Sequence, residues 1–416
     1  MTPSRAPFGA LSDLRIIDLT QMLAGPYATM MLADHGAQVI KIESPEGDMS
    51  RTAGGAESAA GKPRTLVGYF QSIDRNKDSV VLDLKTEGGR NALKALIKDA
   101  DALVENFRVG VMERLGLGYE ILKEINPRLV YGAVRGFGDP RTGVSPYQHW
   151  PAFDVTAQAM GGIMAITGTD PATPTKIGPG IGDIVPGMML GFGLLAAIHN
   201  ARRTGVGQFV DVAMTDAMLA ICERTLWQYS TSQKAPVPEG NHHPFLCPFG
   251  IFPAVDGFVS IAAHFDPFFE TFCRQIDAPE LLDDPAFATR DARVRNRLNV
   301  IEQIAERTRR FTKAELAERL GGRLPFGPVM DIAEIERDPH FIARDMIVDV
   351  DEPGHSPIQV AGVPIKLART PGGVNRRAPY LGEHTRQRLA EAGLSAAEID
   401  HLIAQREAAA FDGQRG

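Results

Sequence analysis

The sequence predicts an α/β fold, in which a doubly wound, mostly parallel sheet domain is followed by a smaller α+β domain. Strand-like apolar runs alternate with helical patterns from residue 14 to about residue 135, as in successive βαβ units. A polar, proline-bearing stretch over residues 230–239 then precedes a predicted hairpin that turns at Asp256–Gly257. Helical patterns follow the hairpin, so a second, smaller core is expected there.

The chain opens on one complete βαβ unit. We expect a strand over residues 14–19, a helix that ends at Gly36 and a second strand over residues 38–43. The loop Leu23–Pro26 stands between the first strand and the helix, where open sheets of this type bind ligands. It carries no G-x-G-x-x-G pattern, so a dinucleotide site is not indicated.

Further strands extend the predicted sheet, and helices connect them. These strands cover residues 79–84, 102–107, 129–134 and 207–214, and a helix is expected from Thr215 to about Tyr229. We therefore divide the chain into three regions: the first part of a large domain, a small α+β domain, and a C-terminal return that packs on the large domain, with bounds 1–229, 230–330 and 331–416.

A glycine-rich segment leads into a long apolar helix and presents one acid at its start. Asp183 stands where a helix N-cap would, Pro186 falls in the predicted first turn, and Gly205 follows as a stop. The helix would cover residues 184–204. A carboxylate there faces free N–H groups and the positive end of the helix dipole, so we expect Asp183 to be an anion.

Two interpretations of Asp183 follow from this position. An anion at a helix start can serve as a nucleophile, and the preceding glycines would let a substrate or cofactor approach the backbone. The alternative is that Asp183 only caps the helix. The glycines and the apolar character of the helix favour the nucleophile.

Composition excludes several classes of function. The net charge of −7 disfavours a nucleic-acid partner held by bulk electrostatics. Cys222, Cys247 and Cys273 form no C-x-x-C pair, so we expect neither a metal site nor disulfides, and a cytoplasmic location. The longest apolar run, residues 184–198, is shorter than the roughly 20 residues of a membrane span, so no membrane role is expected.

Basic side chains recur near the ends of the predicted strands. Each alone is typical of a solvated charge, but together at one sheet edge they could hold the phosphates of a nucleotide-like cofactor. They are Lys41, Lys85, Arg108, Arg114 and Arg135.

Motifs along nearly the whole chain resemble those of the class III CoA-transferases, in the same order. They are Leu23-Ala-Gly-Pro26, Val39–Glu43, Gly47-Asp48, Asn76-Lys77, Leu82–Lys85, Val104–Phe107, Asn126-Pro127, Gly182-Asp183, Arg203–Gln208 and Leu381–His384. The resemblance implies an interlocked homodimer, with each chain threaded through its partner. It also implies acyl-CoA and a carboxylic acid as substrates, with no tightly bound cofactor, metal or ATP.

The resemblance gives Asp183 the role of nucleophile, through anhydride and aspartyl-CoA thioester intermediates. It places the CoA contacts on Met22, Leu82, Lys85, Asn106, Phe107, Arg114 and Met214. Ser44 departs from the family pattern, because an arginine that can stack on the adenine stands there in the oxalate-using relatives. The adenine contacts are therefore left open.

The acyl groups would be lined by Gln21, Tyr69, Phe153, Asp154, His242 and His243. Residues 239–244 replace the glycine run with which the oxalate enzymes close over their intermediates, which argues against oxalate. We expect transfer of CoA from an acyl-CoA donor, with succinyl-CoA as a candidate, to a small organic (di)carboxylic acid.

Two other functions stay open at this point. The family's racemases of 2-methylacyl-CoA use a His-Asp pair where this chain has Phe153-Asp154, so one of the two bases is missing. A non-catalytic CoA-binding protein is the remaining alternative.

Overall fold

The structure is a computed structural model that describes residues 8–53, 66 and 68–411. By their contacts, the residues form two compact units, which are described separately below. The first comprises Met1–Ile163, Ile177–Glu223 and Pro339–Gly416, and the second Met164–Lys176 and Arg224–Asp338. The second unit thus extends beyond the predicted small domain, residues 230–330, and takes in a segment from far upstream.

The first unit is built on a seven-stranded sheet with the order β12-β3-β2-β1-β4-β5-β6. All neighbouring pairs are parallel except β12 with β3, which is antiparallel. The bounds are β1 Arg15–Asp18, β2 Gln38–Glu43, β3 Asp78–Leu82, β4 Ala102–Glu105, β5 Val130–Arg135, β6 Phe209–Ala213 and β12 Ala408–Ala409. The predicted doubly wound, mostly parallel sheet is confirmed.

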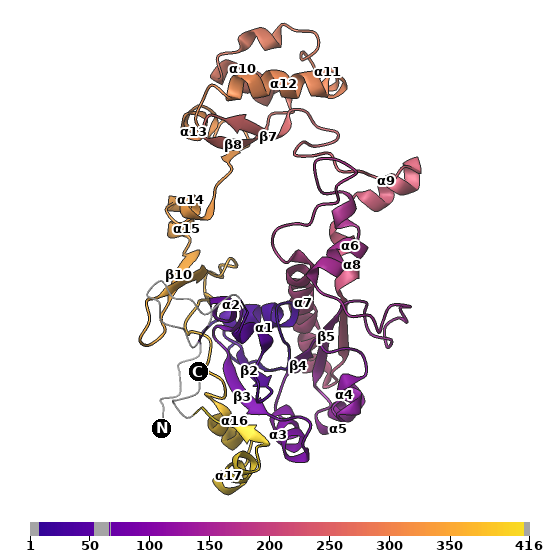
Figure 1. The fold of residues 1–416 in the computed structure, drawn as a ribbon, viewed down its shortest axis with the longest axis vertical. Coiled ribbons are helices and arrows are strands. Elements are labelled where there is room, and N and C mark those ends of the chain that lie inside the picture. The colour runs from indigo at the N-terminus through magenta and orange to yellow at the C-terminus, as the bar shows by residue number, and fades with distance from the viewer. Residues whose placement is uncertain (1–7, 54–65, 67, 412–416) are drawn as a thin grey trace. The chain divides into compact units, whose positions relative to one another are not determined.

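Helices cover both faces of this sheet, which is why its central strands are buried almost throughout. On one face α1 packs against α7, and α7 also contacts β5 and β6. The opposite face forms an apolar core with α3, α5, α16 and α17 (Figure 1). The helices of the first unit are α1 Ala24–Asp34, α2 Gly68–Asp74, α3 Glu87–Ile97, α4 Val111–Arg114, α5 Tyr119–Ile125, α6 Asp154–Met160, α7 Ile181–Thr204, α8 Met214–Ile221, α15 Pro339–Ala343, α16 Thr385–Glu391 and α17 Ala396–Ala404, with a short 3₁₀ turn at η1 Met49–Arg51. The 3₁₀ turn η2 Ile163–Ala165 begins at the last residue of one segment of the first unit and ends in the second unit.

The C-terminal residues of the first unit lie along β3. Asp78, the first residue of β3, pairs with Arg376 at 2.7 Å and with Arg388 at 2.8 Å. The Ser79 hydroxyl accepts a hydrogen bond from the N–H of Gly382 at 2.9 Å. A separate antiparallel pair, β10 Ile347–Val350 and β11 Ile358–Ala361, precedes these contacts.

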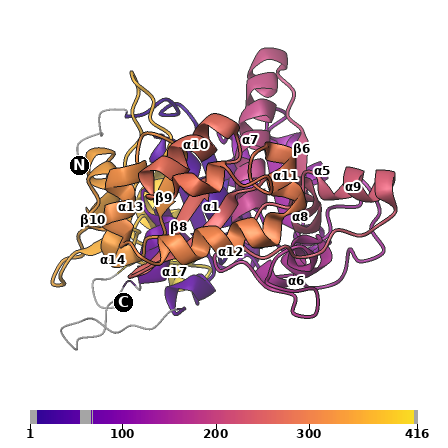
Figure 2. The same ribbon diagram turned by 90° about the horizontal axis from the view of Figure 1, so that it is seen from above.

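The second unit has its own antiparallel sheet of order β7-β8-β9 and its own apolar core. The predicted hairpin is present, because Ala254 at the end of β7 pairs with Gly257 at the start of β8. Helices α10, α12 and α13 gather around these strands (Figure 2). The bounds are α9 Thr225–Ser232, β7 Phe249–Ala254, β8 Gly257–Ala262, α10 Asp266–Gln275, η3 Pro279–Leu282, α11 Arg290–Arg295, α12 Arg297–Thr308, α13 Lys313–Leu320, β9 Phe326–Pro328 and α14 Ile332–Ile335.

One predicted helix is wrong in its continuity. The sequence predicted a single helix from Thr215 to about Tyr229. In the structure α8 ends at Ile221, and a second helix, α9, begins at Thr225. The residue after the break, Cys222, has its thiol against the Gly161 carbonyl at 3.7 Å. The predicted linker from residue 230 therefore begins inside α9.

Helix α7 begins at Ile181, three residues before the predicted helix over residues 184–204. It has 24 residues and is long and apolar enough, by length and composition, to cross a membrane. A buried core helix has the same composition, and the contacts of α7 with α1, β5 and β6 are those of a core helix.

Candidate active site

The first turn of α7 holds Asp183, but not as the cap that the sequence predicted. The helix begins at Ile181 with Gly180 as its N-cap, so Asp183 lies in the first turn and Pro186 lies beyond it. The N–H of Asp183 donates to the Gly180 carbonyl at 3.1 Å. The predicted end is correct, because Gly205 follows the helix with a φ of 78°.

Asp154, the first residue of α6, supplies the cap instead. Its Oδ1 accepts a hydrogen bond from the N–H of Gly182 at 2.8 Å and another from Nε2 of Gln158 at 2.8 Å. Oε1 of Gln158 accepts from the N–H of Ile177 at 3.0 Å. The start of α6 therefore fixes both the glycine-rich approach and the first turn of α7.

The environment of Asp183 favours the neutral acid more than the sequence suggested. Burial, and secondly the charge of Asp154, raise the pKa of Asp183 to about 7. The helix dipole predicted an anion, but with a pKa of about 7 both the neutral and the ionised form of Asp183 are present at neutral pH. Two carboxyl groups held at one helix start repel each other, and the sequence alone did not reveal the pair.

The glycines around Asp183 serve close packing as well as access. A Cβ on Gly182 would lie 2.5 Å from the Asp154 carbonyl oxygen, and one on Gly187 would lie 2.4 Å from the Ala24 carbonyl oxygen. These two glycines therefore let α6 and α1 approach α7. Only open space surrounds the Cβ position of Gly178, so this glycine keeps the role of access that the sequence suggested.

The turn between β1 and α1 reaches the same place. The Cβ position of Gly180 lies 3.0 Å from Cδ2 of Leu23. The side chain of Asn106, which follows β4, bonds both backbone polar groups of Gln21 in this turn. Its Oδ1 accepts from the Gln21 N–H at 2.9 Å, and its Nδ2 donates to the Gln21 carbonyl at 2.8 Å. The predicted residues Gln21 and Met22 are thus beside the start of α7, and Asn106 holds the turn from β4.

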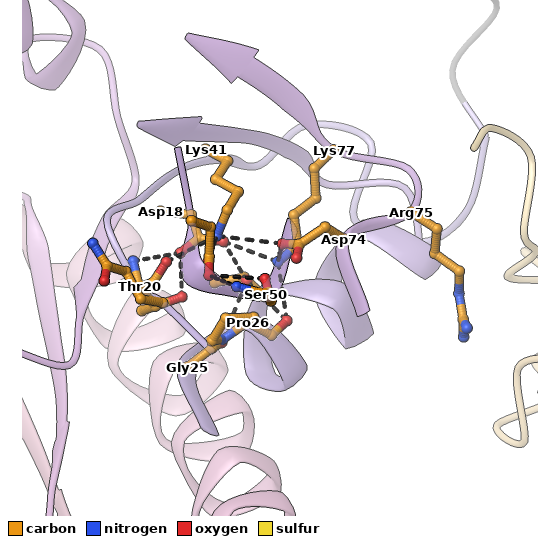
Figure 3. A network of polar contacts seen from close by, with 12 residues as sticks. Asp18, Thr20, Gly25, Pro26, Lys41, Ser50, Asp74, Arg75 and Lys77 are labelled. Atoms are coloured by element: carbon orange, nitrogen blue, oxygen red, sulfur yellow. Dashed lines mark hydrogen bonds and ion pairs between the residues drawn. The ribbon is translucent and has the colours of Figure 1, made fainter. Parts of the chain in front are cut away.

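A fully buried cluster of charges lies behind this turn (Figure 3). Lys77 pairs with Asp18 at 3.0 Å and with Asp74 at 2.8 Å, and Lys41 pairs with Asp74 at 3.4 Å. Lys41 also pairs with Asp48 at 2.8 Å and donates to the Thr20 carbonyl at 2.8 Å. Although burial opposes it, these acids raise the pKa of Lys41.

The proposed phosphate role of Lys41 is therefore wrong, because its ammonium group is buried and paired with Asp48 and Asp74. Arg135 is occupied in the same way. It is buried and pairs with Glu105 and Asp139, and its Nε donates to the Phe107 carbonyl at 3.0 Å. Arg135 and Glu105, which accepts from the Phe107 N–H at 2.7 Å, instead shape the turn after β4.

Tyr69 in α2 lies within the electrostatic reach of both groups. Burial first, and then the charges of Asp183, Asp48 and Asp74, raise the pKa of its hydroxyl. The predicted lining residue Tyr69 is therefore near both Asp183 and the buried acids, and its hydroxyl stays protonated, able to donate a hydrogen bond.

A cavity of about 190 Å³ lies at the sheet edge in the first unit. Its lining includes the predicted residues Asn106, Phe107 and Phe153, together with Arg108 and Arg135. Because Phe153 directly precedes Asp154, one wall of this cavity is continuous with the carboxylate pair. The structure thus brings Gln21, Met22, Asn106, Phe107, Phe153 and Asp154 around one edge of the sheet.

The other predicted CoA residues fall into two kinds. Lys85 and Arg114 are exposed and follow β3 and β4, so their charges are available to a ligand. Leu82 and Met214 are buried, with exposed fractions of 1% and 5%, which leaves little of their side chains for contact. Both lie at strand ends, where the backbone can still face a ligand.

His242 and His243 belong to the second unit, where they line a groove of about 1070 Å³. Burial, and secondly Arg297, lower the pKa of His242. Its Nδ1 is buried and has no hydrogen-bond partner among the described residues. The assignment of the two histidines as lining residues of the acyl groups stays a prediction.

Sequence reasoning did not single out Gln158, Lys77 or Asp74. Gln158 stands four residues after Asp154, which on a helix places both on one face, so its spacing was a usable signal. Lys77 belonged to a quoted motif, but nothing in the sequence shows that its charge is buried.

Among the described residues, no group of three or more His, Cys, Asp or Glu side chains is arranged to hold a metal ion. The three cysteines are buried, and none of them forms a disulfide with another described residue. Burial raises the pKa of Cys247 to about 11 and that of Cys273 to about 12, so neither is a thiolate nucleophile at neutral pH. Asp183 is the better candidate for covalent chemistry.

Comparisons with known proteins show the family to which the chain belongs. The family model described as CoA-transferase family III matches residues 11–385. The chain is 47% identical over 392 residues to the succinyl-CoA:mesaconate CoA-transferase of Haloarcula hispanica, covering 93% of this chain and 97% of that protein. It is 36% identical to the succinate–glutarate CoA-transferase of Agrobacterium fabrum, covering 94% and 96%.

A solved structure has the same fold over nearly the whole chain. A CAIB/BAIF family protein from Brucella suis is 35% identical and superposes with a TM-score of 0.82, covering 92% of this chain and 100% of that one. This chain therefore belongs to CoA-transferase family III and is a class III CoA-transferase.

Proposed function

We propose that the chain transfers CoA from succinyl-CoA to a small dicarboxylic acid through covalent intermediates on Asp183. The observation that carries this proposal is a half-buried carboxyl group in the first turn of α7, whose pKa is raised by burial and by the charge of Asp154, in a chain of this family. The relatives named above act, by name, on succinyl-CoA or succinate and on mesaconate or glutarate, which are dicarboxylic acids.

The reaction has four balanced acyl transfers. The Asp183 carboxylate attacks the succinyl-CoA carbonyl, which gives a mixed anhydride and CoA thiolate. The thiolate attacks the aspartyl carbonyl, which gives an aspartyl-CoA thioester and succinate. The acceptor carboxylate displaces CoA again to form a second anhydride. The thiolate finally attacks the acceptor's carbonyl, which releases the new acyl-CoA and restores Asp183.

The surroundings of Asp183 suit these steps. A carboxylate with a pKa of about 7 is a stronger nucleophile once ionised than one of ordinary pKa, and burial limits hydrolysis of the anhydrides. The charge of Asp183 contributes to the raised pKa of the Tyr69 hydroxyl. This protonated hydroxyl is proposed to donate a hydrogen bond to the thioester carbonyl oxygen, which gains negative charge during the attack.

CoA is proposed to lie along the carboxyl edge of the sheet. From β3, which precedes Lys85, to β6, which precedes Met214, the sheet spans roughly 25 Å at the usual strand spacing, which suits an elongated ligand. The pantetheine arm would occupy the cavity lined by Asn106, Phe107 and Phe153. The exposed Lys85 and Arg114 are then available for the phosphates.

The active form is proposed to be an interlocked homodimer in the cytoplasm. The face of α7 that turns away from the sheet exposes apolar side chains, of which Phe192 is 77% exposed, together with Met188, Met189 and Leu195. A second copy of the chain would remove this apolar surface from water. The three free cysteines are in keeping with a reducing compartment.

The test is to follow thioester exchange from succinyl-CoA to a panel of mono- and dicarboxylic acids by chromatography. We expect one new acyl-CoA for each succinyl-CoA consumed, with mesaconate or glutarate accepted and butyrate rejected. An Asp183→Ala variant should bind CoA and transfer nothing. Full activity in that variant, or deuterium exchange at the α-carbon without an acceptor, would overturn the proposal, the second result in favour of a racemase.

A further inference from the structure

The turn between β1 and α1 is held by side chains that lie far away in the sequence. The Thr20 carbonyl accepts from Lys41 at 2.8 Å, and the Thr20 N–H donates to Asp18 at 2.9 Å. The Asn106 side chain accepts a hydrogen bond from the Gln21 N–H and donates one to the Gln21 carbonyl. Each of these peptide groups therefore has one fixed direction.

Met22, the next residue, has a backbone conformation that needs such support. Its φ is 66°, in the left-handed region that side chains other than glycine rarely adopt. The N–H of Met22 donates to Oδ1 of Asp48 at 3.2 Å. Asp48 is thus the group that binds the strained peptide of this turn.

The Asp48 carboxylate is itself immobile. Its side chain is 1% exposed, and its Oδ2 pairs with Lys41 at 2.8 Å. Its Oδ1 also accepts from the N–H and the hydroxyl of Ser50, each at 2.8 Å. The N–H of Asp48 donates to Glu43 at 3.1 Å. These contacts leave the carboxylate no freedom to turn away from Met22.

The turn lies directly against the helix that carries Asp183. Cδ2 of Leu23 is 3.0 Å from the Cβ position of Gly180, three residues before Asp183. No hydrogen bond holds the Gln21 carboxamide within the described part of the chain, so the backbone beneath it sets its direction. A change at Met22 would therefore redirect both Gln21 and Leu23, and Leu23 contacts the segment that leads to Asp183.

We propose that Asp48 is a positioning residue for CoA transfer: through the N–H of Met22 it fixes the turn that faces the acyl-CoA thioester at Asp183. This inference rests on the proposed function. Asp48 touches no substrate. Its effect is on geometry, and a displacement of about 1 Å near reacting atoms can lower a rate by about 100-fold.

The test compares Asp48→Ala with Asp34→Ala in the full chain. Asp34 is a matched control, because it is also buried and pairs with Arg75 at 2.7 Å, but it lies at the opposite end of α1. Both variants lose stability. At a temperature where both remain folded, kcat for CoA transfer should fall about 10- to 100-fold in Asp48→Ala and stay within about threefold of the wild type in Asp34→Ala.

Two further variants separate positioning from folding. Asp48→Asn keeps an oxygen that accepts from Met22, so its kcat should stay within about threefold of the wild type even if its stability falls. In a protein that already carries Met22→Gly, Asp48→Ala should lower kcat less than it does in the wild type. The reason is that glycine adopts a positive φ without support.

The inference is overturned if Asp48→Ala keeps the wild-type kcat, if Asp34→Ala loses as much, if Asp48→Asn is as slow as Asp48→Ala, or if the two changes at 48 and 22 are simply additive. Failure of the wild-type chain to transfer CoA would instead overturn the proposed function. The wild-type exchange assay is run first, so the two failures are distinguishable.

Discussion

Asp154 binds the N–H of Gly182 at 2.8 Å, one residue before Asp183, and its negative charge adds to the burial that raises the pKa of Asp183 to about 7. One carboxylate therefore positions the other and also sets its protonation. This relationship is the centre of the site, and it gives a pH dependence that can be measured.

The first prediction concerns the pH profile of Asp154→Asn. In the wild type, the rate of the first acyl transfer should rise as the pH passes about 7, because only ionised Asp183 attacks. The asparagine oxygen can still accept from Gly182, but the repelling charge is gone. The midpoint of the rise should therefore move to lower pH. An unchanged midpoint in single-turnover measurements would contradict the role given to Asp154.

The second prediction concerns stability. Because folding raises the pKa of Asp183 from 3.8 to about 7, its contribution to the free energy of unfolding is lost as the pH rises through that interval. The neutral Asp183→Asn should therefore be more stable than the wild type at pH 8, by at most about 4 kcal/mol. At pH 4 the two proteins should unfold at nearly the same temperature, which thermal unfolding at both pH values would check.

The third prediction uses two glycines of the same segment. Alanine in a helix normally stabilises by up to about 1 kcal/mol relative to glycine. At Gly187 the sign should reverse, because the added Cβ would lie 2.4 Å from the Ala24 carbonyl oxygen. Gly191→Ala is the matched control, because Gly191 lies in the same helix and the nearest atom to its added Cβ, the Ala28 carbonyl oxygen, would be 3.9 Å away. Equal melting temperatures for both variants would show that α1 does not pack against α7 as described.

The fourth prediction separates two lysines that the sequence treated alike. Lys41→Met should lower the free energy of unfolding by about 3–5 kcal/mol, because it leaves buried acids without their partner. Lys85→Ala should leave unfolding nearly unchanged and weaken CoA binding, because this lysine is exposed. Denaturant titration and equilibrium binding of CoA measure the two effects. If Lys41→Met instead weakened CoA binding and left unfolding unchanged, Lys41 would have to be a CoA contact.

Most of the first sheet could be predicted from sequence because its strands are short apolar runs at βαβ spacing. The run that became β2, residues 38–43, was placed at the observed bounds. The end of α7 was also predictable, because Gly205 acts locally through its own φ. Periodicity and turn residues are local signals, and they gave the elements that depend on local structure.

What could not be predicted depends on contacts between distant residues. The cap of α7 comes from Asp154, on a different helix, so a local pattern assigned the role to Asp183. The charges of Lys41 and Arg135 looked exposed at strand ends, but both side chains are buried beside acids from other elements, Asp74 of α2 and Glu105 of β4. For the same reason the sequence could not show that Asp48 supports Met22.

The central claim is that the carboxylate of Asp183 forms a covalent intermediate with CoA. The most direct measurement is to mix the protein with succinyl-CoA, trap the adduct with hydroxylamine, and locate the modified residue by mass spectrometry of peptides. We predict a hydroxamate on Asp183 that requires succinyl-CoA and is absent from Asp183→Asn. A hydroxamate on another residue, or exchange without any trapped adduct, would contradict the account.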